Sequence, residues 1–321
     1  MNITVIGCGR WVSLITLYLD HIGHRVTLYG RAASPRMQAF LTTRQNDLLT
    51  LPESVALSTA LDAALEGAET VIISIGSQSL RALLGQPELQ ALRSRTVVLC
   101  MKGLEMGTGA RLSQIAAELL HPSNTVAVWL GPGHVQEFYR GIPNCMVIDS
   151  ENEDAKRRLV QAFSSDLIRF YYGGDMIGTE VGAAAKNVVG IAAGFLDGFE
   201  MSSLKGALMS RGTREVARLI KAMGGSELSA YGLCHLGDYE ATVFSPYSHN
   251  RQFGESFVRG QDYHQLAEGY YTVKALMLLG QRYGVELPIC KAVHDILYEQ
   301  AVPRDVLAGL LRRGLTEEFY D

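Results

Sequence analysis

The sequence lacks the features that mark disulfide-rich, zinc-binding, membrane-spanning and secreted proteins. Its five cysteines include no Cys-x-x-Cys pair, which argues against a disulfide framework or a structural zinc and favours a reducing compartment. No apolar run approaches the ~20 residues that a membrane span needs, and residues 1–7 contain no charged segment leading into the apolar core of a signal peptide. We therefore expect a cytoplasmic protein that does not insert into a membrane.

A strong charge of either sign is also missing. The net charge is −4 over 321 residues, with mixed signs along the chain, so neither nucleic acid nor an anionic membrane surface is expected as a partner. Apolar residues make up 47% and charged residues 19% of the sequence, as is usual for globular proteins. The length suffices for two domains with a substantial core.

The chain opens with a pattern typical of dinucleotide binding. Residues 3–6 are a short β-branched run, Gly7 and Gly9 follow, and helical periodicity starts at Val12. Gly7 permits the tight turn, and Gly9 lets the backbone approach a pyrophosphate at the helix N-terminus. Val12 stands where a third glycine is usual, so we expect either a helix set further from the strand or an altered phosphate loop.

The end of the next expected strand, residues 24–29, bears on the choice of cofactor. An acidic residue at this place would bind a ribose 2′-hydroxyl, whereas an arginine accepts a 2′-phosphate. Arg31 follows the strand and Arg36 is nearby, which favours NADPH over NADH. The alternative is a solvated surface arginine.

Strands and helices alternate through the first half and predict a doubly wound parallel sheet of the Rossmann type. After residue 172 the β-runs stop, and helices are expected at residues 178–198, 205–223, 266–283, 292–299 and 301–312. The fold class is therefore α/β followed by all-α, with a dinucleotide-binding domain over residues 1–172 and a helical substrate domain over residues 173–321. The expected strands cover residues 3–6, 24–29, 55–58, 70–75, 96–101, 126–130, 146–148 and 168–172.

Residues 178–198 form the most unusual of the expected helices. Between residues 181 and 196 they are apolar or small on every face except at Lys186 and Asn187, and a helix that is hydrophobic all round is buried. A buried ammonium is costly without a partner or ligand, so Lys186 is a candidate functional lysine. The alternatives are a lysine that reaches the surface or one that pairs with Glu180.

Residues 236–254 are a polar island, rich in Asp, Thr, Ser, His, Asn and Arg together with Pro and Gly, and we expect a loop there. Most polar loops are solvated connections, but a helical domain paired with a nucleotide domain must supply substrate contacts, and this is its richest source. His134 and His235 are isolated histidines that form no recognised metal-ligand motif. Such histidines more often serve packing or hydrogen bonding, so we predict no metal site.

With these residues assembled, the chain resembles the bacterial NAD(P)-dependent glycerol-3-phosphate dehydrogenases over nearly its whole length. The resemblance implies interconversion of dihydroxyacetone phosphate and sn-glycerol 3-phosphate, for glycerophospholipid precursor synthesis, with NAD(P)H as cofactor and a small phosphorylated molecule as substrate. The motifs that carry it are Gly7-x-Gly9-x-Trp11, Ser77-Gln78-x-Leu80-Arg81, Lys102-Gly103-Leu104-Glu105, Gly131-Pro132, Ala184-Ala185-Lys186-Asn187-Val188, Ser210-Arg211-Gly212, Leu236-Gly237-Asp238, Ser245-Pro246-x-Ser248-x-Asn250-Arg251-x-Phe253-Gly254 and Glu268-Gly269.

The resemblance also implies roles for single residues. Lys186 is the expected catalytic lysine, with Lys102 and Asp238 beside it; a lysine in apolar surroundings has a lowered pKa and can act as acid and base. Asp238 would orient it and limit that fall. The implied substrate contacts are Lys102, Gly131, Asn187, Thr242, Ser248, His249 and Asn250. The implied cofactor contacts are Gly7, Gly9, Arg10, Trp11, Arg31, Lys102, Val135, His249, Leu266 and Glu268.

Three positions depart from the family pattern. His249 stands where the family has a phosphate-binding arginine, Gly133 where it has a Ser or Thr, and Val12 in place of the third glycine. Arg251 is a candidate to compensate for His249. If cationic His249 binds phosphate, substrate affinity should fall as pH rises through ~6–7.

These departures leave two alternatives open. One is a paralogue that reduces a different small phosphorylated or carboxylated ketone. The other is a catalytically inactive, NAD(P)-binding regulatory protein, although a chain released from catalysis has no reason to keep a costly buried lysine. The buried helices of the second domain fit a homodimer interface as well as an ordinary core.

Overall fold

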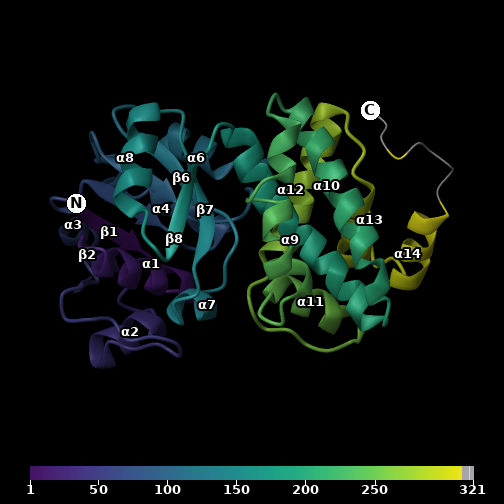
Figure 1. The fold of residues 1–321 in the computed structure, drawn as a ribbon, viewed down its shortest axis with the longest axis horizontal. Helices are drawn as coiled ribbons and strands as arrows, with labels where there is room; N and C mark the ends of the chain where they lie inside the picture. The colour runs from purple at the N-terminus through teal and green to yellow at the C-terminus, as the bar shows by residue number, and fades with distance from the viewer. Residues whose placement is uncertain (313–317, 319–321) are drawn as a thin grey trace. The chain divides into compact units, whose positions relative to one another are not determined.

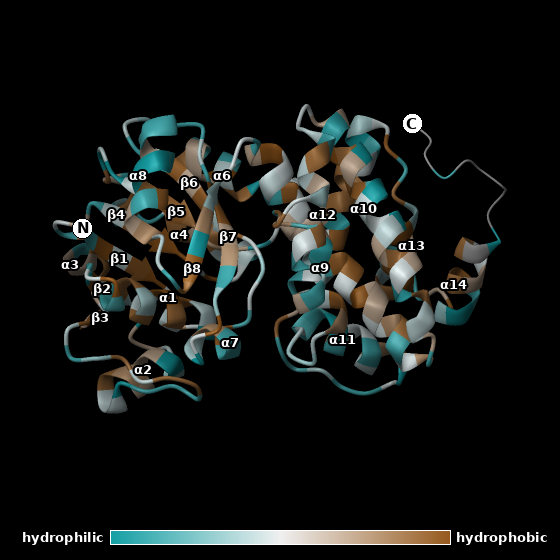
Figure 2. Ribbon diagram, in the orientation of Figure 1, coloured by the Kyte–Doolittle hydropathy of each residue, from teal (hydrophilic) through white to brown (hydrophobic). Residues whose placement is uncertain are grey.

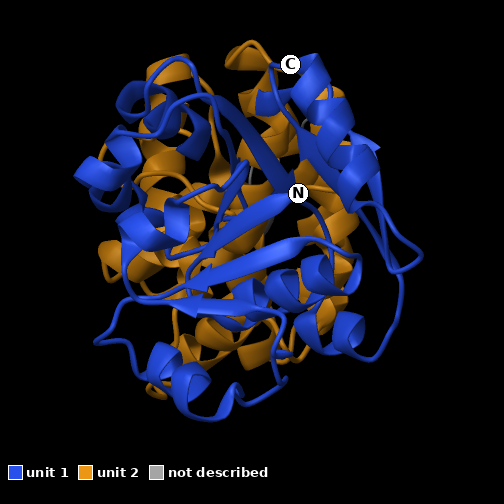
Figure 3. Ribbon diagram, turned by 90° about the vertical axis from the view of Figure 1, so that its left-hand side faces the viewer, with its two compact units in different colours: residues 1–101, 112–176 blue, residues 102–111, 177–321 orange. Residues whose placement is uncertain are grey.

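The computed structural model describes residues 1–312 and residue 318, and the chain forms two compact units (Figures 1 and 3). Unit 1 comprises Met1–Met101 and Leu112–Met176, and unit 2 comprises Lys102–Arg111 and the chain from residue 177 onward. Residues 102–111, which lie well before the change from strands to helices in the sequence, therefore belong to the helical unit. Within the described residues, no helix is both long enough and apolar enough to cross a membrane.

Unit 1 is built on an eight-stranded sheet in the order β3-β2-β1-β4-β5-β6-β7-β8. Each of the expected strands is present: β1 (Asn2–Ile6), β2 (Arg25–Tyr29), β3 (Ala56–Ser58), β4 (Thr70–Ile73), β5 (Thr96–Leu99), β6 (Thr125–Leu130), β7 (Asn144–Asp149) and β8 (Ile168–Tyr172). The helices of this unit are α1 (Arg10–His21), α2 (Pro35–Thr43), α3 (Leu61–Leu65), α4 (Leu80–Leu84), α5 (Pro87–Gln90), α6 (Leu112–Leu119), α7 (Val135–Tyr139) and α8 (Glu153–Phe163), with a 3-10 turn η1 (Ser77–Ser79).

The sheet is doubly wound, as expected, but it is not parallel throughout. β7 pairs antiparallel with β6, with Trp129 opposite Ile148, and β8 then runs parallel to β7. Parallel neighbours need a crossover connection, usually a full helix. The β6–β7 connection carries only the five-residue α7, whereas the eleven-residue α8 supplies the crossover from β7 to β8.

Apolar side chains on both faces of the strands form the core of unit 1. β4 and β5 are buried at every residue, as strands covered on both faces require, and Figure 2 colours the middle of the sheet as hydrophobic. Trp129 on β6 is buried, with its ring 5.7 Å from Phe163 on α8 and 4.9 Å from Phe170 on β8. This aromatic cluster joins the last two strands to the parallel part of the sheet.

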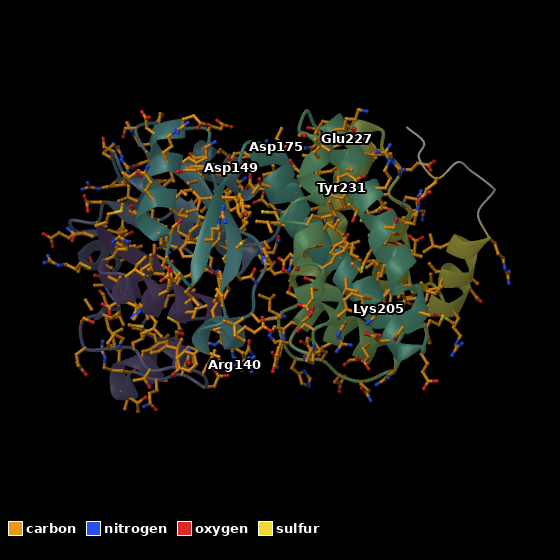
Figure 4. The ribbon with its side chains drawn as sticks, viewed as in Figure 1. Arg140, Asp149, Asp175, Lys205, Glu227 and Tyr231 are labelled. Carbon is orange, nitrogen blue, oxygen red and sulfur yellow. The ribbon has the colours of Figure 1, made fainter. Side chains whose placement is uncertain are left out.

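A buried lysine fixes the point where the chain leaves the sheet, near Asp149 and Asp175 in Figure 4. Lys156 Nζ on α8 donates to Gly173 O at 2.6 Å and lies 3.6 Å from Asp149 Oδ1. Asp149 Oδ2 accepts from Asp175 N at 3.1 Å. A Cβ at position 173 would lie 2.2 Å from Asp149 Cγ, so Gly173 permits this close approach.

Unit 2 is helical. Its helices are α9 (Met176–Gly198), α10 (Lys205–Ala222), α11 (His249–Val258), α12 (Glu268–Tyr283), α13 (Pro288–Tyr298) and α14 (Pro303–Leu311), with 3-10 turns η2 (Ser202–Leu204), η3 (Glu227–Tyr231) and η4 (Leu236–Asp238) and a π-helical turn η5 (Glu240–Phe244). Every residue of α9 between 181 and 196 is buried. The expectation that this helix lies in a core is therefore confirmed.

The prediction of a loop across the polar island is wrong from residue 249 onward, where α11 begins. Ser248 caps this helix, its hydroxyl accepting from Arg251 N at 3.3 Å, as serine commonly does at an N-terminus. Phe253 and Phe257 lie one turn apart, with ring centroids separated by 6.1 Å. The polar composition of the segment hides this apolar pair, which faces neighbouring aromatic side chains.

Glycines let α9 and α11 pack backbone against backbone. A Cβ at Gly194 would lie 2.1 Å from Arg251 O, and one at Gly254 would lie 2.2 Å from Ile191 O. Either side chain would force the helices apart, because the neighbouring atoms are main chain and cannot rotate away. The close approach brings the start of α11 alongside the turn of α9 that carries Asn187.

Candidate active site

Two lysines and one aspartate meet inside unit 2. Lys186 on α9 is only 7% exposed, and its Nζ lies 2.9 Å from Asp238 Oδ2. Lys102, from the segment 102–111, places its Nζ 2.6 Å from the same oxygen. Asp238 lies in the turn η4 and is 1% exposed. The pairing with Asp238 rules out the alternatives of a lysine that reaches the surface or pairs with Glu180, whose carboxylate contacts Arg111 at 2.6 Å.

The charges of this cluster tune Lys186. Burial lowers the pKa of Lys186, the negative charge of Asp238 opposes that fall, and the positive charge of Lys102 adds to it, leaving a pKa of about 8. Lys186 Nζ also donates to Thr242 Oγ1 at 2.7 Å, and that hydroxyl in turn donates to Asp238 O. With both lysines protonated the three side chains carry a net positive charge, which suits an anion or a carbonyl oxygen that gains negative charge.

A chain of amide hydrogen bonds surrounds the cluster. Asn187 Nδ2 donates to Lys102 O at 2.8 Å, and Asn187 Oδ1 accepts from Asn250 Nδ2 at 3.0 Å. Asn250 Oδ1 accepts from Gly269 N at 2.9 Å, at the start of α12, directly after Glu268. Five of the predicted substrate contacts (Lys102, Asn187, Thr242, Ser248 and Asn250) are thus linked to one another or belong to the same capped turn.

His249 is held by a phenol. Its Nδ1 lies 2.7 Å from Tyr263 Oη, and Tyr263 donates to Gln252 Oε1 at 3.2 Å. Arg251 does not stand in for the missing family arginine: it contacts Asp197 Oδ2 at 2.7 Å and Glu255 Oε2 at 3.0 Å and donates to Ser245 O. Nothing in the sequence pattern pointed to Tyr263, because this contact depends on how the chain returns after α11.

Asp197 anchors the segment that carries Ser248, His249 and Asn250. Near the end of α9, its Oδ2 contacts both Arg251 and Lys205 at 2.7 Å (Lys205 is labelled in Figure 4). Lys205 Nζ also donates to Val243 O at 3.0 Å. These contacts connect α9, α10 and the turn before α11, and no motif in the sequence indicates them.

In unit 1, the glycine turn leads directly into the N-terminus of α1. Gly9 is the N-cap of α1 and makes no side-chain cap, and the first turn of the helix contains no acidic residue. Gly7 has φ +128°, and a Cβ there would lie 2.4 Å from Ser74 O. Val12 is 1% exposed and packs beneath Gly7 in the core. The turn therefore tolerates the missing third glycine and leaves the helix N-terminus able to receive a pyrophosphate.

The other predicted residues of unit 1 lie around this turn or at neighbouring strand ends. Arg10 pairs with Asp47, and Trp11 packs between Trp129 and Phe138, with ring centroids 6.5 and 6.0 Å away. Gly131 follows β6 and Val135 opens α7. Arg31 follows β2 and is exposed.

Gly133 has a local reason to lack a side chain. Its φ is +139°, and a Cβ would lie 2.2 Å from the Phe138 ring, so a Ser or Thr does not fit this backbone. In unit 2, Leu266 is 53% exposed and Glu268 is the first residue of α12. Among the described residues, no group of three or more His, Cys, Asp or Glu side chains is arranged to hold a metal ion.

A Rossmann-type sheet with a glycine turn and a helical unit with a buried lysine paired to an aspartate define the class of two-unit NAD(P)-dependent dehydrogenases. Residues 2–156 and 175–308 match the N-terminal and C-terminal parts of the NAD-dependent glycerol-3-phosphate dehydrogenase family. The chain belongs to this family, as the sequence motifs predicted.

Individual members of this family are similar to the chain over nearly their full lengths. The glycerol-3-phosphate dehydrogenase [NAD(P)+] of Thermoanaerobacter sp. is 32% identical, covering 100% of this chain and 99% of that protein. The enzyme of the same name from Thermus thermophilus is 36% identical and covers 99% and 100%. The crystal structure of glycerol-3-phosphate dehydrogenase from Coxiella burnetii superimposes with a TM-score of 0.89 at 27% identity, covering 97% of this chain and 99% of that one.

Proposed function

We propose that the protein interconverts dihydroxyacetone phosphate and sn-glycerol 3-phosphate with NAD(P)H, and that it does so in the cytoplasm. The observation that carries the proposal is the placement of Lys186 and Lys102 on one oxygen of Asp238, at 2.9 and 2.6 Å. Reduction of a ketone needs a hydride, a proton for the oxygen, and positive charge to stabilise that oxygen while it becomes negative. Lys186 and Lys102 meet the last two needs.

Each residue of the site has a separate role in reduction of the ketone. NAD(P)H held at the glycine turn of Gly7 and Gly9 would supply the hydride for the carbonyl carbon. Protonated Lys186 donates a proton from Nζ to the carbonyl oxygen, so that C=O becomes CH–OH, and Lys102 stabilises the negative charge on that oxygen. Asp238 holds both ammonium groups, and Thr242 accepts from Lys186 Nζ and so directs it. Asn187 and Asn250 fix the Lys102 backbone and contribute polar groups for the substrate.

The cofactor is proposed to be held by the glycine turn of unit 1, with NADPH favoured over NADH. Burial raises the pKa of the Cys8 thiol in this turn, and the Ser34 hydrogen bond together with the positive charges of Arg36 and Arg31 opposes that rise. Arg36 Nη1 lies 4.0 Å from where a Cβ on Gly9 would be. Two guanidinium groups beside the turn suit a ribose 2′-phosphate.

The test of the proposed function is turnover of dihydroxyacetone phosphate by wild-type protein and by Lys186→Ala, followed through consumption of NADPH or NADH. We expect Lys186→Ala to lose ~10³-fold in kcat while cofactor binding, read from the fluorescence of Trp11 beside the glycine turn, stays intact. The matched control is Lys221→Ala, a lysine of α10 that is 60% exposed, and it should match wild type. Wild-type protein that binds cofactor but does not turn over would contradict the proposal.

A second substrate class is favoured by one observation, the imidazole of His249 in the place of a family arginine. A neutral imidazole offers one donor, whereas a guanidinium offers a permanent charge and a bidentate fork. The same assay with a small carboxylated ketone and with a second phosphorylated ketone decides between the substrates. A kcat/KM for either that exceeds the value for dihydroxyacetone phosphate would establish the altered specificity.

A further inference from the structure

His235 and Tyr239 flank Asp238 in the sequence and bond to each other in the core of unit 2. Both are 0% exposed. Tyr239 Oη lies 2.7 Å from His235 Nε2, and His235 Nδ1 lies 2.8 Å from Gly182 O on α9. The sequence pattern favours packing or hydrogen bonding over metal binding for His235, and the proposed mechanism uses neither residue.

The hydrogen bonds define the state of both groups. A carbonyl oxygen can only accept, so His235 Nδ1 carries the proton and donates to Gly182 O; Nε2 then accepts from the Tyr239 hydroxyl. Burial lowers the pKa of His235 to about 4, a shift that the Gly182 contact opposes and the Lys186 charge reinforces. Burial also raises the pKa of Tyr239. Both side chains are therefore neutral near pH 7 and add no third charge beside the two lysines.

This pair connects the two parts of the cluster. Gly182 lies one helical turn before Lys186, and in an α-helix the carbonyl of residue 182 accepts from the backbone N–H of residue 186. His235 thus fixes the peptide that positions Lys186. Its own carbonyl accepts from Asp238 N at 3.0 Å, so the same residue fixes the turn that positions Asp238. A Cβ at Gly182 would lie 3.1 Å from His235 Cβ, so the glycine lets His235 pack closely against α9.

We propose that His235 and Tyr239 are positioning residues that keep the Asp238 carboxylate in register with Lys186, and so set the working range of the acid/base lysine. The inference rests on the proposed function. The charge of Asp238 holds the pKa of Lys186 up against burial. If the pair is weakened, the carboxylate moves away from Lys186, its charge acts less strongly, and Lys186 loses its proton at lower pH.

Tyr239→Phe is the sharpest test, because it removes one hydroxyl and leaves the ring in place. We expect the pH above which reductive kcat falls to move below the wild-type value by about one unit, with a drop in kcat of roughly tenfold and little change in KM. His235→Asn, whose amide can still donate to Gly182 O but whose shorter side chain does not reach the Tyr239 hydroxyl, should shift the profile in the same direction. Thr213 also hydrogen-bonds to the Tyr239 hydroxyl and loses that contact in Tyr239→Phe, whereas His235→Asn leaves it in place. The Glu215 carboxyl and the Cys290 thiol are unchanged in both variants.

Tyr298→Phe is the matched control. It removes another phenol of unit 2, one that donates to Tyr270 O at 2.6 Å, and its pH profile should be that of wild type. A Tyr239→Phe enzyme that is less stable or less active but has an unshifted profile would overturn the inference and leave a purely structural role.

A second readout separates this inference from the proposed function. NMR titration of the Lys186 side chain in lysine-labelled protein follows its pKa whether or not the protein turns over dihydroxyacetone phosphate. A lowered pKa in Tyr239→Phe supports the positioning role even if wild-type protein is inactive with that substrate. An unchanged pKa overturns it even if the wild-type enzyme is fully active.

Discussion

Lys186 Nζ lies 2.9 Å from Asp238 Oδ2 in the interior of the helical unit. Because the same oxygen also contacts Lys102, a single carboxylate holds two ammonium groups whose charges it only half neutralises. A buried excess of positive charge is costly unless a ligand supplies an anion. The cluster is therefore built for a substrate that brings negative charge, as a phosphorylated ketone does.

The pH dependence of catalysis should follow Lys186. Reduction needs its protonated form and oxidation its neutral form, and its pKa is about 8. The kcat for reduction of dihydroxyacetone phosphate should therefore fall as pH rises through about 8, and the kcat for oxidation of glycerol 3-phosphate should rise over the same range. The measurement is kcat in both directions with saturating substrates. It covers about pH 6 to 10, which is about two units on either side of that pKa. Parallel profiles in the two directions would contradict the assignment of the proton donor.

Cofactor preference should depend on Arg31. If its guanidinium binds the 2′-phosphate, Arg31→Ser should raise KM for NADPH by ~10–100-fold, the effect of losing a charge-assisted contact, while KM for NADH stays nearly constant. The matched control is Arg25→Ser, an exposed arginine at the opposite end of β2. Equal changes for the two cofactors would show that Arg31 does not read the 2′-phosphate.

Much of the fold could be predicted because it depends on local pattern. Apolar runs and the glycines after β1 indicate a Rossmann-type sheet, and the uniformly apolar stretch around Lys186 indicates a buried helix. The direction of β7 could not be predicted, since it depends on how the connection through α7 packs. α11 was missed because a serine cap and two phenylalanines lie within a polar segment.

The site divides in the same way. Lys186 could be predicted as a functional lysine because the residues around it in the same helix are uniformly apolar or small. Its partners come from distant segments, and only the fold decides that Asp238 faces it while Glu180 faces Arg111. No spacing rule predicts the side-chain contacts between separate segments, which include His249 with Tyr263 and Asp197 with Lys205 and Arg251.

The close packing of α9 on α11 should be sensitive to one methyl group. Gly194→Ala places a Cβ where Arg251 O and Glu255 N lie 2.1 and 2.7 Å away, so the helices must separate at a cost of about 1–3 kcal/mol. Activity should fall as well, because α11 carries Asn250. Gly206→Ala is the control: nothing lies within 4 Å of its Cβ, and it should be neutral or stabilise α10 by up to ~1 kcal/mol. Urea unfolding followed by far-ultraviolet circular dichroism compares the two, and equal midpoints would contradict the packing argument.

Acid should destabilise unit 2 through His235. The folded protein keeps this imidazole neutral down to about pH 4, whereas an unfolded chain takes up the proton near pH ~6.5. Between these values the unfolded state binds more protons, so stability is lost as pH falls, by roughly 3 kcal/mol over the whole window. His235→Asn lacks this group and should show a shallower loss. Both tryptophans, Trp11 and Trp129, lie in unit 1, so their fluorescence serves as an internal control while circular dichroism follows the helical unit. The free energy of unfolding followed by circular dichroism is compared between wild type and His235→Asn from pH ~6.5 down to ~4. If both proteins lose the same amount of stability over this range, His235 is not a buried neutral histidine and its bond to Gly182 must be weaker than the geometry indicates.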